Sequence, residues 1–454
     1  MRVVIAGAAE VGTHLAKLLA REKMDVILMD PDPEKTSQLT FFNIMTLTGS
    51  LTSISDLREA GVHKADLFVA VSPNESVNIH ACILAANLGA RKTVARVDSN
   101  ETMMEDNADF YKKIGINRLV YPELLGGKAV VSAINRTWAR STHELCDGRL
   151  LLLCVKVYGE AGHPIIGKTL IEIGKNFGRF HIAAIIRGEE LIIPKGSDTI
   201  EAEDLIYFIV TPENDKYVRL ACKKKETHIN RVVFIGGTRL GIQASRLLPK
   251  NMAITFVNHG QKEAEYLKNM VPNAEIIDGS SSNMEEWNEI GLSSTDAIVA
   301  LGDNSGENVL ACLMAKKLKV GKTVVEVEDV DYIAIADKLN IGSVVNKKIL
   351  TASVIYQLLL RSDKTSAKTY SIYDAEVAEF VAQPNSKITQ KTVFQLNLSR
   401  NITLGGLVRN GEGMTITGNT VILPGDQVVV VFRDENIGQI EKLFMIMNWS
   451  LIRY

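Results

Sequence analysis

The sequence predicts an α/β protein with two Rossmann-like, doubly wound parallel-sheet domains, each followed by a small α+β domain. The first observation behind this prediction is an internal repeat, in which Gly49 to Arg96 reappears as Gly279 to Glu326, 230 residues later. The second is a regular alternation of short β-rich runs with amphipathic segments. Because the two halves match, a fold predicted for one half applies to the other.

The first copy alternates β-rich runs with helical segments from its first residues. Each run is short, and an amphipathic stretch separates it from the next. Such alternation with tight connections predicts a parallel sheet that helices cover on both faces. The predicted strands are Arg2–Ala6, Val26–Met29, Ile44–Leu47, Leu67–Val71 and Thr93–Val97.

A longer helix is expected after each sheet domain, over 122–140 in the first copy and over 347–360 in the second. Both carry an apolar stripe, which makes them candidates for packing against another module and for transmitting a change in conformation. The same stripe would also suit an ordinary core helix.

Strand-like runs broken by Gly and charged turns follow the first long helix, at 150–157, 182–187, 191–194 and 205–210. Their second copy lies 222 residues on, so that Arg187 matches Arg409 and Asp204 matches Asp426. Polar linkers are expected at 223–226 and 361–368. The predicted domains are 1–140, 141–225, 229–362 and 369–454.

Composition excludes several classes of protein. The 454 residues carry 51 basic and 53 acidic side chains, a net charge of −2, so no bulk positive field would attract nucleic acid. No apolar run approaches the roughly 20 residues that a membrane-spanning helix needs. The five cysteines show neither metal-ligand nor CxxC spacing, which favours reduced, buried thiols and a cytoplasmic location.

A glycine-rich turn between the first strand and the first helix is the motif that carries chemistry. Gly7 permits the tight turn and Gly12 lets helix and strand pack closely, while the helix N-terminus offers unpaired N–H groups to a diphosphate. Alanine stands at the middle position, where glycine is usual and where a methyl group would crowd the phosphate. The motif residues are Gly7, Ala8, Ala9, Glu10, Val11 and Gly12.

Asp30 ends the second predicted strand, 18 residues after Gly12. A carboxylate at that point accepts hydrogen bonds from ribose hydroxyls and repels a 2′-phosphate, which favours NAD or an adenosine nucleotide over NADP. The alternative is that Asp30 only caps the helix that follows. The coincidence of turn and acid favours nucleotide binding.

The second copy keeps the outer glycines of the turn but loses other features of the motif. A β-branched threonine replaces the middle residue, Asn258 replaces the carboxylate, and Glu326 reverses the charge of Arg96. A weakened or absent second nucleotide site is therefore expected, although an arginine in the loop leaves room for a phosphate bound differently. The residues of this weaker site are Gly236, Gly237, Thr238, Arg239 and Leu240.

With these motifs in their order, the chain resembles the TrkA family, whose members contain two regulator-of-potassium-conductance (RCK, or KTN) units in tandem. The resemblance covers nearly the whole length. It rests on the glycine turn, Asp30, several positions of the sheet domain and the small C-terminal module. The matching pieces include 57–61, 65–66, 69–71, Asn78, 95–96, 122–123, 167–170, Arg187, 193–194 and 203–204.

The resemblance implies roles for particular residues. Residues 7–11 would hold a pyrophosphate and Asp30 the ribose of NAD, NADH, ATP or ADP. Ser72 and Pro73, after the fourth strand, and Arg96, at the end of the fifth, would complete the pocket. Their alternatives are an ordinary strand-to-helix turn for Ser72-Pro73 and a surface ion pair for Arg96.

Such proteins are cytoplasmic gating subunits at the inner face of the membrane, bound to a potassium transporter of the TrkH type. Two tandem chains would supply four RCK units to a ring whose conformation responds to nucleotide. One alternative is an NAD-dependent oxidoreductase, but the eight histidines show no acid/base pattern. The other is an RCK regulator of a different class of potassium channel.

Overall fold

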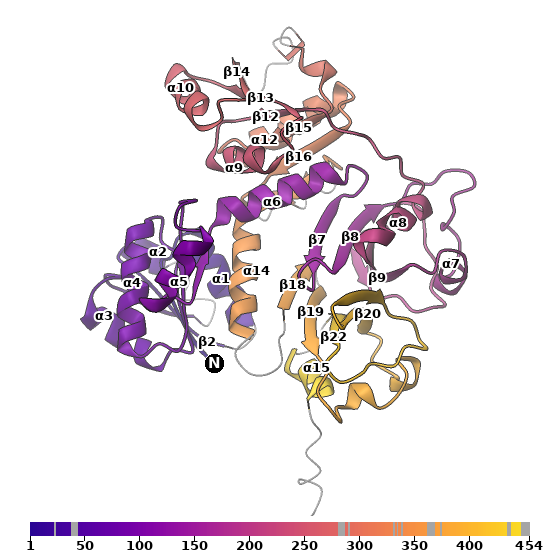
Figure 1. The fold of residues 1–454 in the computed structure, drawn as a ribbon, viewed down its shortest axis with the longest axis horizontal. Helices are drawn as coiled ribbons and strands as arrows, with labels where there is room; N and C mark the ends of the chain where they lie inside the picture. The colour runs from indigo at the N-terminus through magenta and orange to yellow at the C-terminus, as the bar shows by residue number, and fades with distance from the viewer. Residues whose placement is uncertain are drawn as a thin grey trace, which may run out of the picture. The chain divides into compact units, whose positions relative to one another are not determined.

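The computed structural model of the chain describes residues 1–21, 24–37, 44–279, 287–288, 291–329, 332–333, 335–336, 339–360, 368–372, 375–433 and 437–445. Most of the linker predicted at 361–368 lies outside these residues. The described chain forms four sheets in succession (Figure 1). It divides into two compact units, Met1–Gly126 with Asn346–Leu359 and Gly127–Val345 with Leu360–Tyr454.

The first sheet has six parallel strands in the order β3-β2-β1-β4-β5-β6. This order reverses direction between β1 and β4, which is the doubly wound arrangement predicted from the sequence. Its strands and helices are β1 (Arg2–Ala6), α1 (Glu10–Arg21), β2 (Asp25–Asp30), α2 (Pro33–Ser37), β3 (Met45–Thr48), α3 (Ile54–Glu59), β4 (Leu67–Ala70), α4 (Glu75–Leu88), β5 (Thr93–Arg96), α5 (Glu105–Lys113), β6 (Arg118–Val120) and α6 (Pro122–Asn135).

The core of this sheet comes from its apolar strands. Residues 3–6 are all fully buried, as are Phe68 and Val69 on the neighbouring strand. Strands covered on both faces carry continuous apolar runs instead of alternating ones, which is why the sequence shows short bursts. The α/β fold class is confirmed.

The third sheet repeats the first, with the strand order β14-β13-β12-β15-β16-β17. Its elements are β12 (Arg231–Ile235), α9 (Arg239–Leu247), β13 (Ala253–Asn258), α10 (Gln261–Met270), β14 (Glu275–Asp278), β15 (Ala297–Ala300), α12 (Ser305–Lys317), β16 (Lys322–Glu326), β17 (Ser343–Val345) and α14 (Lys347–Leu360).

The two long helices do not behave alike with respect to the compact units. Helix α14 belongs to the first unit, with the first sheet, although it follows the last strand of the third sheet. Helix α6 is divided at Gly126 and continues into the second unit. It ends at Asn135 and not near Arg140 as predicted, because the Arg140 amide already donates to the Cys154 carbonyl and joins the next sheet.

The two small α+β modules share one topology. The first has the strand order β10-β9-β11-β8-β7 and the second β18-β19-β22-β20-β21, the same path traced from opposite edges. The first comprises β7 (Ser141–Leu145), β8 (Leu150–Lys156), α7 (Leu170–Asn176), β9 (Phe180–Arg187), β10 (Glu190–Ile192), β11 (Leu205–Val210) and α8 (Asp215–Ala221). The second comprises β18 (Lys368–Ile372), β19 (Ala375–Val381), β20 (Ile402–Arg409), β21 (Glu412–Thr415), β22 (Gln427–Phe432) and α15 (Ile437–Phe444).

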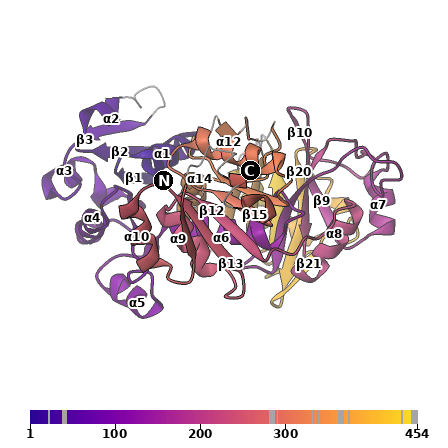
Figure 2. The same ribbon diagram turned by 90° about the horizontal axis from the view of Figure 1, so that it is seen from above.

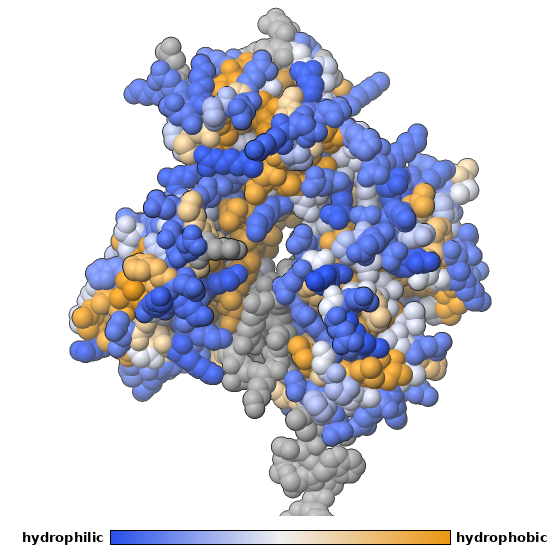
Figure 3. Space-filling view, in the orientation of Figure 1, coloured by the Kyte–Doolittle hydropathy of each residue, from blue (hydrophilic) through white to orange (hydrophobic). Residues whose placement is uncertain are grey.

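Both modules contribute to one hydrophobic core inside the second unit. Leu150 and Leu152 of the first module cluster with Val429 and Val431 of the second, and all four are fully buried. Helices α7 and α8 cover the other face of the first module, and α8 lies beside β9 in both views (Figures 1 and 2). On the face drawn in Figure 3, hydrophilic residues surround smaller hydrophobic areas, as on an ordinary protein surface.

Candidate functional site

The predicted nucleotide-binding residues lie at one edge of the first sheet. Gly7 follows β1, Asp30 ends β2, Ser72 follows β4 and Arg96 ends β5. These four strands are adjacent and parallel, so their carboxyl ends meet where the strand order reverses. Ligands of such sheets bind at that switch point.

The glycine turn is held as its two glycines require. Gly7 has a φ of +114°, and a Cβ atom there would lie 2.7 Å from the backbone nitrogen of Ser72. A Cβ on Gly12 would lie 1.9 Å from the carbonyl oxygen of Gly7. A side chain at either position would therefore push apart the turn, the fourth strand or the first helix.

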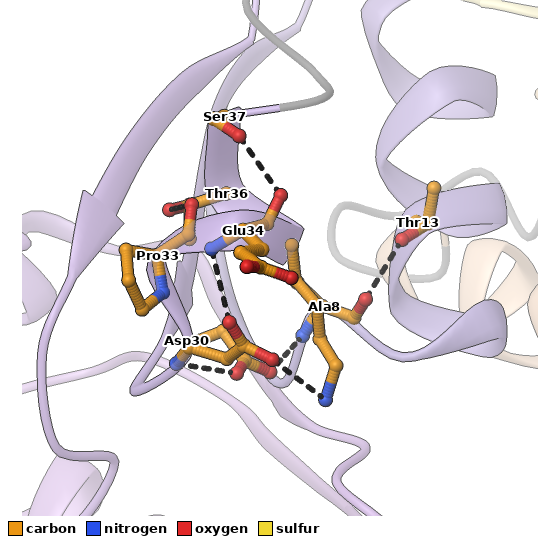
Figure 4. A network of polar contacts seen from close by, with 9 residues as sticks. Ala8, Thr13, Asp30, Pro33, Glu34, Thr36 and Ser37 are labelled. Atoms are coloured by element: carbon orange, nitrogen blue, oxygen red, sulfur yellow. Dashed lines mark hydrogen bonds and ion pairs between the residues drawn. The ribbon is translucent and has the colours of Figure 1, made fainter.

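Asp30 fixes the turn from the neighbouring strand. Its Oδ2 atom accepts a hydrogen bond from the backbone N–H of Ala8 at 2.7 Å, and Oδ1 accepts one from Asp32 at 3.0 Å (Figure 4). The side chain is almost completely buried. A carboxylate offers about four acceptor sites, so two remain for the hydroxyl groups of a ribose. Asp30 also organises the turn before α2, while the carboxylate of Asp32 accepts the backbone N–H of Glu34 in the first turn of that helix.

The first turn of α1 suits a phosphate because Ala9, the middle residue of the glycine turn before it, has no polar side chain. Ala9 cannot accept a hydrogen bond through its side chain, so the first N–H groups of the helix keep their capacity for an anion. Ala9 itself is half-buried, next to the buried Ala8. The carboxylate of Glu10, in the first turn, pairs with the ammonium group of Lys348 on α14.

Ser72 belongs to a buried network that joins the ends of β4 and β5. Asn78 accepts hydrogen bonds from the backbone N–H and the hydroxyl of Ser72 at 2.9 and 2.8 Å. The amide of Asn78 donates to the carbonyl oxygens of Ser72 and Arg96 at 2.9 and 3.0 Å. Ser72 thus shapes the strand-to-helix turn, while Pro73 is exposed at its outside.

Arg96 forms an ion pair with Glu123, the second residue of α6, with Nη2 lying 3.9 Å from Oε1. Glu123 is buried, and its Oε2 atom has no hydrogen-bond partner among the described residues. Glu123 is among the residues that match the family, but no role for it was predicted from the sequence. Its place directly after the sixth strand was the signal that could have drawn attention to it, because that strand ends at the same edge as Asp30.

The second copy repeats the scaffold of the first with different chemistry. Asn258 accepts a hydrogen bond from the backbone N–H of Gly237 at 3.1 Å, which is the contact that Asp30 makes with Ala8. Asn308 joins Gly302 to Glu326 as Asn78 joins Ser72 to Arg96. The loss of the carboxylate at 258 therefore removes charge and leaves the turn supported.

Thr238 changes the helix N-terminus of the second copy. Its hydroxyl accepts a hydrogen bond from the backbone N–H of Gly241 at 3.4 Å and acts as the N-cap of α9. A capped donor is less available to a phosphate. A Cβ at Gly241 would come no closer than 3.2 Å to any atom, so this helix also packs less tightly on its turn than α1 does.

No metal site accompanies either loop in the described part of the chain. No three His, Cys, Asp or Glu side chains are grouped there so that they could hold an ion. Burial raises the pKa of the thiols of Cys82 and Cys222, which makes them poor nucleophiles. None of the described helices is both long and apolar enough to cross a bilayer.

The fold defines a protein with two Rossmann-like sheet domains, each followed by a small α+β module. Family models agree in type and order: the TrkA-N domain matches residues 3–122 and 232–347, and the TrkA-C domain matches 160–220 and 377–445. The chain belongs to the TrkA family of tandem RCK proteins.

Curated relatives match from end to end. The Trk system potassium uptake protein TrkA of Haemophilus influenzae is 27% identical over 453 residues, 98% of each chain. A TrkA homolog of Methanosarcina mazei is 25% identical over 98% of this chain and 100% of its own.

Solved structures share the fold at low sequence identity. The RCK domain of GsuK superimposes with a TM-score of 0.61 at 14% identity, over 98% of this chain and 94% of that one. The GsuK channel bound to NAD gives 0.60 at 15% identity, over 98% and 78%. At such identity the likeness supports the fold alone.

Proposed function

We propose that the chain is the nucleotide-sensing regulatory subunit of a potassium uptake system, with its ligand site in the first sheet domain. The observation that carries this proposal is the arrangement of Asp30 and the α1 turn. A buried carboxylate with two remaining acceptor sites lies beside an uncapped helix N-terminus. The family membership and the names of the relatives, which are potassium uptake proteins, support the transport role.

The proposed ligand is NAD or NADH, with ATP or ADP as the other candidates. The phosphates would lie on the N–H groups of residues 8–11 and the ribose on Asp30. Ser72 and Pro73 border the site from β4, and Arg96 with Glu123 borders it from β5 and α6. The GsuK channel was solved with NAD bound, which agrees with a dinucleotide for this fold.

The proposed role is regulatory and not catalytic. A nucleotide regulates a transporter only if it binds two conformations with different affinities, and a coupling of about 1–3 kcal/mol gives several-fold control. The contact of Glu10 with Lys348 links the proposed phosphate site to α14. We further propose that the chain is cytoplasmic and binds a membrane transporter of the TrkH type. Two copies of the chain would form a dimer that supplies a ring of four RCK units.

Calorimetry of NADH, NAD and ATP with wild type, Asp30→Ala and Asp30→Asn tests the ligand site. Asparagine keeps an acceptor for the Ala8 N–H, as Asn258 does for Gly237, but removes the charge that binds ribose. We expect at least tenfold weaker binding in both variants. The matched control is Asn258→Ala in the second copy, which should leave the first site unchanged.

Binding to Asp30→Ala with wild-type affinity would reject the site. The transport role has a separate test, since co-purification with a TrkH-type membrane protein in mild detergent does not depend on the ligand. Absence of that association would reject the proposed partner.

A further inference from the structure

A cavity of about 230 Å³ lies within the second unit, and the residues of neither glycine turn line it. Three parts of the chain line it: the segment after α6, the first α+β module, and the second sheet domain from the end of α12 to the residues just before β17. Five of its lining residues are cationic and none is acidic: Arg140, Lys156, Lys224, Lys316 and Lys322.

Lys322 is the deepest of these cations. It is the first residue of β16, so it lies at the amino end of the strand, whereas nucleotides bind such sheets at the carboxyl ends of the strands. Lys322 is nearly completely buried. Its ammonium group donates hydrogen bonds to the carbonyl oxygens of Ala139 at 2.8 Å and Thr137 at 3.3 Å. Burial, with the charge of Arg140 as the lesser cause, lowers the pKa of Lys322 to about 7.

Two of the other cations, Lys224 and Lys156, lie beside the ring of Tyr158. Lys224 places its ammonium group 4.3 Å from the centre of the Tyr158 ring, and Lys156 lies 5.8 Å from it. The Tyr158 hydroxyl accepts a hydrogen bond from Asn340 at 2.7 Å, and the Asn340 carbonyl accepts one from Lys316. Burial is the main cause that lowers the pKa of Lys224 and of Lys316.

In the described part of the chain, the carboxylates that act on Lys224 are those of Glu160 and Glu203. Glu203 pairs with Lys156 at 3.0 Å, and its own side chain is mostly exposed. Like charges gathered in a partly desolvated cavity disfavour the folded state, and a bound anion would remove that cost. The arrangement therefore has the physical properties of an anion site.

Comparison of the two copies separates this cluster from what the fold requires. The residue that matches Lys322 in the first copy is Lys92, whose ammonium group donates to the carbonyl oxygen of Leu358 near the end of α14. In both copies this lysine thus donates to backbone carbonyl oxygens near the end of a long helix, within α14 for Lys92 and just after α6 for Lys322. The residue that matches Lys316 is Ala86, so the additional charge belongs to the second copy alone.

We propose that this cavity binds a small, multiply charged phosphate anion that joins the first α+β module to the second sheet domain. Sites for drug-sized ligands usually occupy about 300–1,000 Å³, so a cavity of about 230 Å³ fits a phosphate or diphosphate group and not a whole nucleotide. Lys224, Lys316 and Arg140 bring donors to it from all three parts of its lining. The proposal is independent of the nucleotide site.

Calorimetry with pyrophosphate, inorganic phosphate and ADP tests the proposal at constant ionic strength, with chloride as the reference salt. The variants are Lys316→Ala, which copies the first repeat, and the double change Lys224→Gln with Lys316→Ala. The matched control is Lys268→Gln, which removes one exposed lysine from α10 of the same sheet domain. The melting temperature of each variant without ligand checks that it folds.

We expect pyrophosphate to bind wild type with an affinity that falls as salt rises, and to raise its melting temperature. Binding should weaken at least tenfold in the double variant, weaken less in Lys316→Ala and stay unchanged in Lys268→Gln. The affinity for inorganic phosphate should fall in the same order among the variants. That result would identify a free phosphate anion as the ligand of the cavity. An ADP affinity that falls equally would show that a larger metabolite enters, and would overturn the size argument.

Two outcomes reject the site itself. One is wild-type protein that binds neither pyrophosphate nor phosphate. The other is a double variant that folds and binds pyrophosphate as wild type does, because the anion would then occupy another place, such as a glycine turn.

Discussion

The guanidinium group of Arg187 holds the carboxylate of Asp204 through two parallel hydrogen bonds, of 2.9 Å from Nε and 2.8 Å from Nη2. Asp204 is fully buried and also accepts the backbone N–H of Glu201 at 2.8 Å. Arg409 and Asp426 repeat the pair in the second module at 2.9 and 2.7 Å. These residues matched each other in the sequence repeat. In each module the pair connects the strand that carries the arginine to the turn that carries the aspartate.

The Arg187–Asp204 pair should be a large single contribution to the stability of the first module. Removing one partner of a buried pair costs about 3–5 kcal/mol, and we expect the lower end for Asp204→Asn because Arg187 is partly exposed. Urea unfolding measures the loss. Glu201→Gln is the control: its pair with Arg187 is exposed, so less than about 1 kcal/mol should be lost. Equal effects of the two changes would contradict this explanation.

The middle residue of each glycine turn should tune ligand binding. In Ala9→Thr the new hydroxyl should cap α1 as Thr238 caps α9, and so compete with a phosphate for the Gly12 N–H. A cap is worth about 1 kcal/mol, so NADH should bind about fivefold more weakly while the ligand-free protein melts slightly higher. Calorimetry and thermal melts give both values. A fall in both affinity and melting temperature would indicate misfolding instead.

The reverse change, Thr238→Ala, is the matched experiment in the second copy. It should lower the stability of α9 by a similar amount because it removes the cap. A new NADH site in this variant would show that the cap, more than Asn258, closes the second turn.

The joint between the two α+β modules should weaken in acid through His181. Its ring is hydrogen-bonded to the hydroxyl of Thr403 at 2.9 Å and to the carbonyl oxygen of Ile416 at 3.3 Å. Burial lowers the pKa of His181 to about 4, with Lys195 adding to the effect. Since the folded state binds fewer protons than the unfolded chain between pH 4 and 6.5, stability falls as pH falls through that window.

The loss should reach at most about 1.4 kcal/mol for each pH unit. Melting temperatures at pH 7 and pH 5 measure it in wild type and in His181→Gln, which should show the smaller decrease. His228→Gln changes an exposed histidine and serves as the control. An identical decrease in all three proteins would assign the pH effect to other groups.

The Glu10–Lys348 contact should carry the response of α14 to nucleotide. Hydrogen exchange of residues 347–360 should slow when NADH binds wild type, and this change should shrink in Lys348→Gln. The charge swap of Glu10→Lys with Lys348→Glu should restore it if the ion pair itself is responsible. Lys113→Gln, an exposed change on α5, should behave as wild type. No slowing in wild type would show that this helix does not sense the ligand.

Much of the sheet architecture was predictable because its determinants are local. Five strands of the first sheet appear at the predicted positions within one residue at either end, since buried parallel strands are apolar along their whole length. The sixth, β6, has only three residues and lies directly before α6, so no separate apolar run marked it. In the sequence, Asn78 was only a position that matched the family and the second copy. Its hydrogen-bond network could not be predicted, because three of the bonds go to backbone atoms that a sequence does not place.

The sequence by itself determined the repeat, the α/β class, the glycine turn and the position of Asp30 after the second strand. These follow from spacing and residue type, which are properties of short segments. Only the tertiary structure decided that Asn258 still supports its turn, that Thr238 caps α9, and that α14 joins the first unit. Such contacts depend on which distant surfaces meet, because an apolar stripe shows that a helix is covered and does not specify its partner.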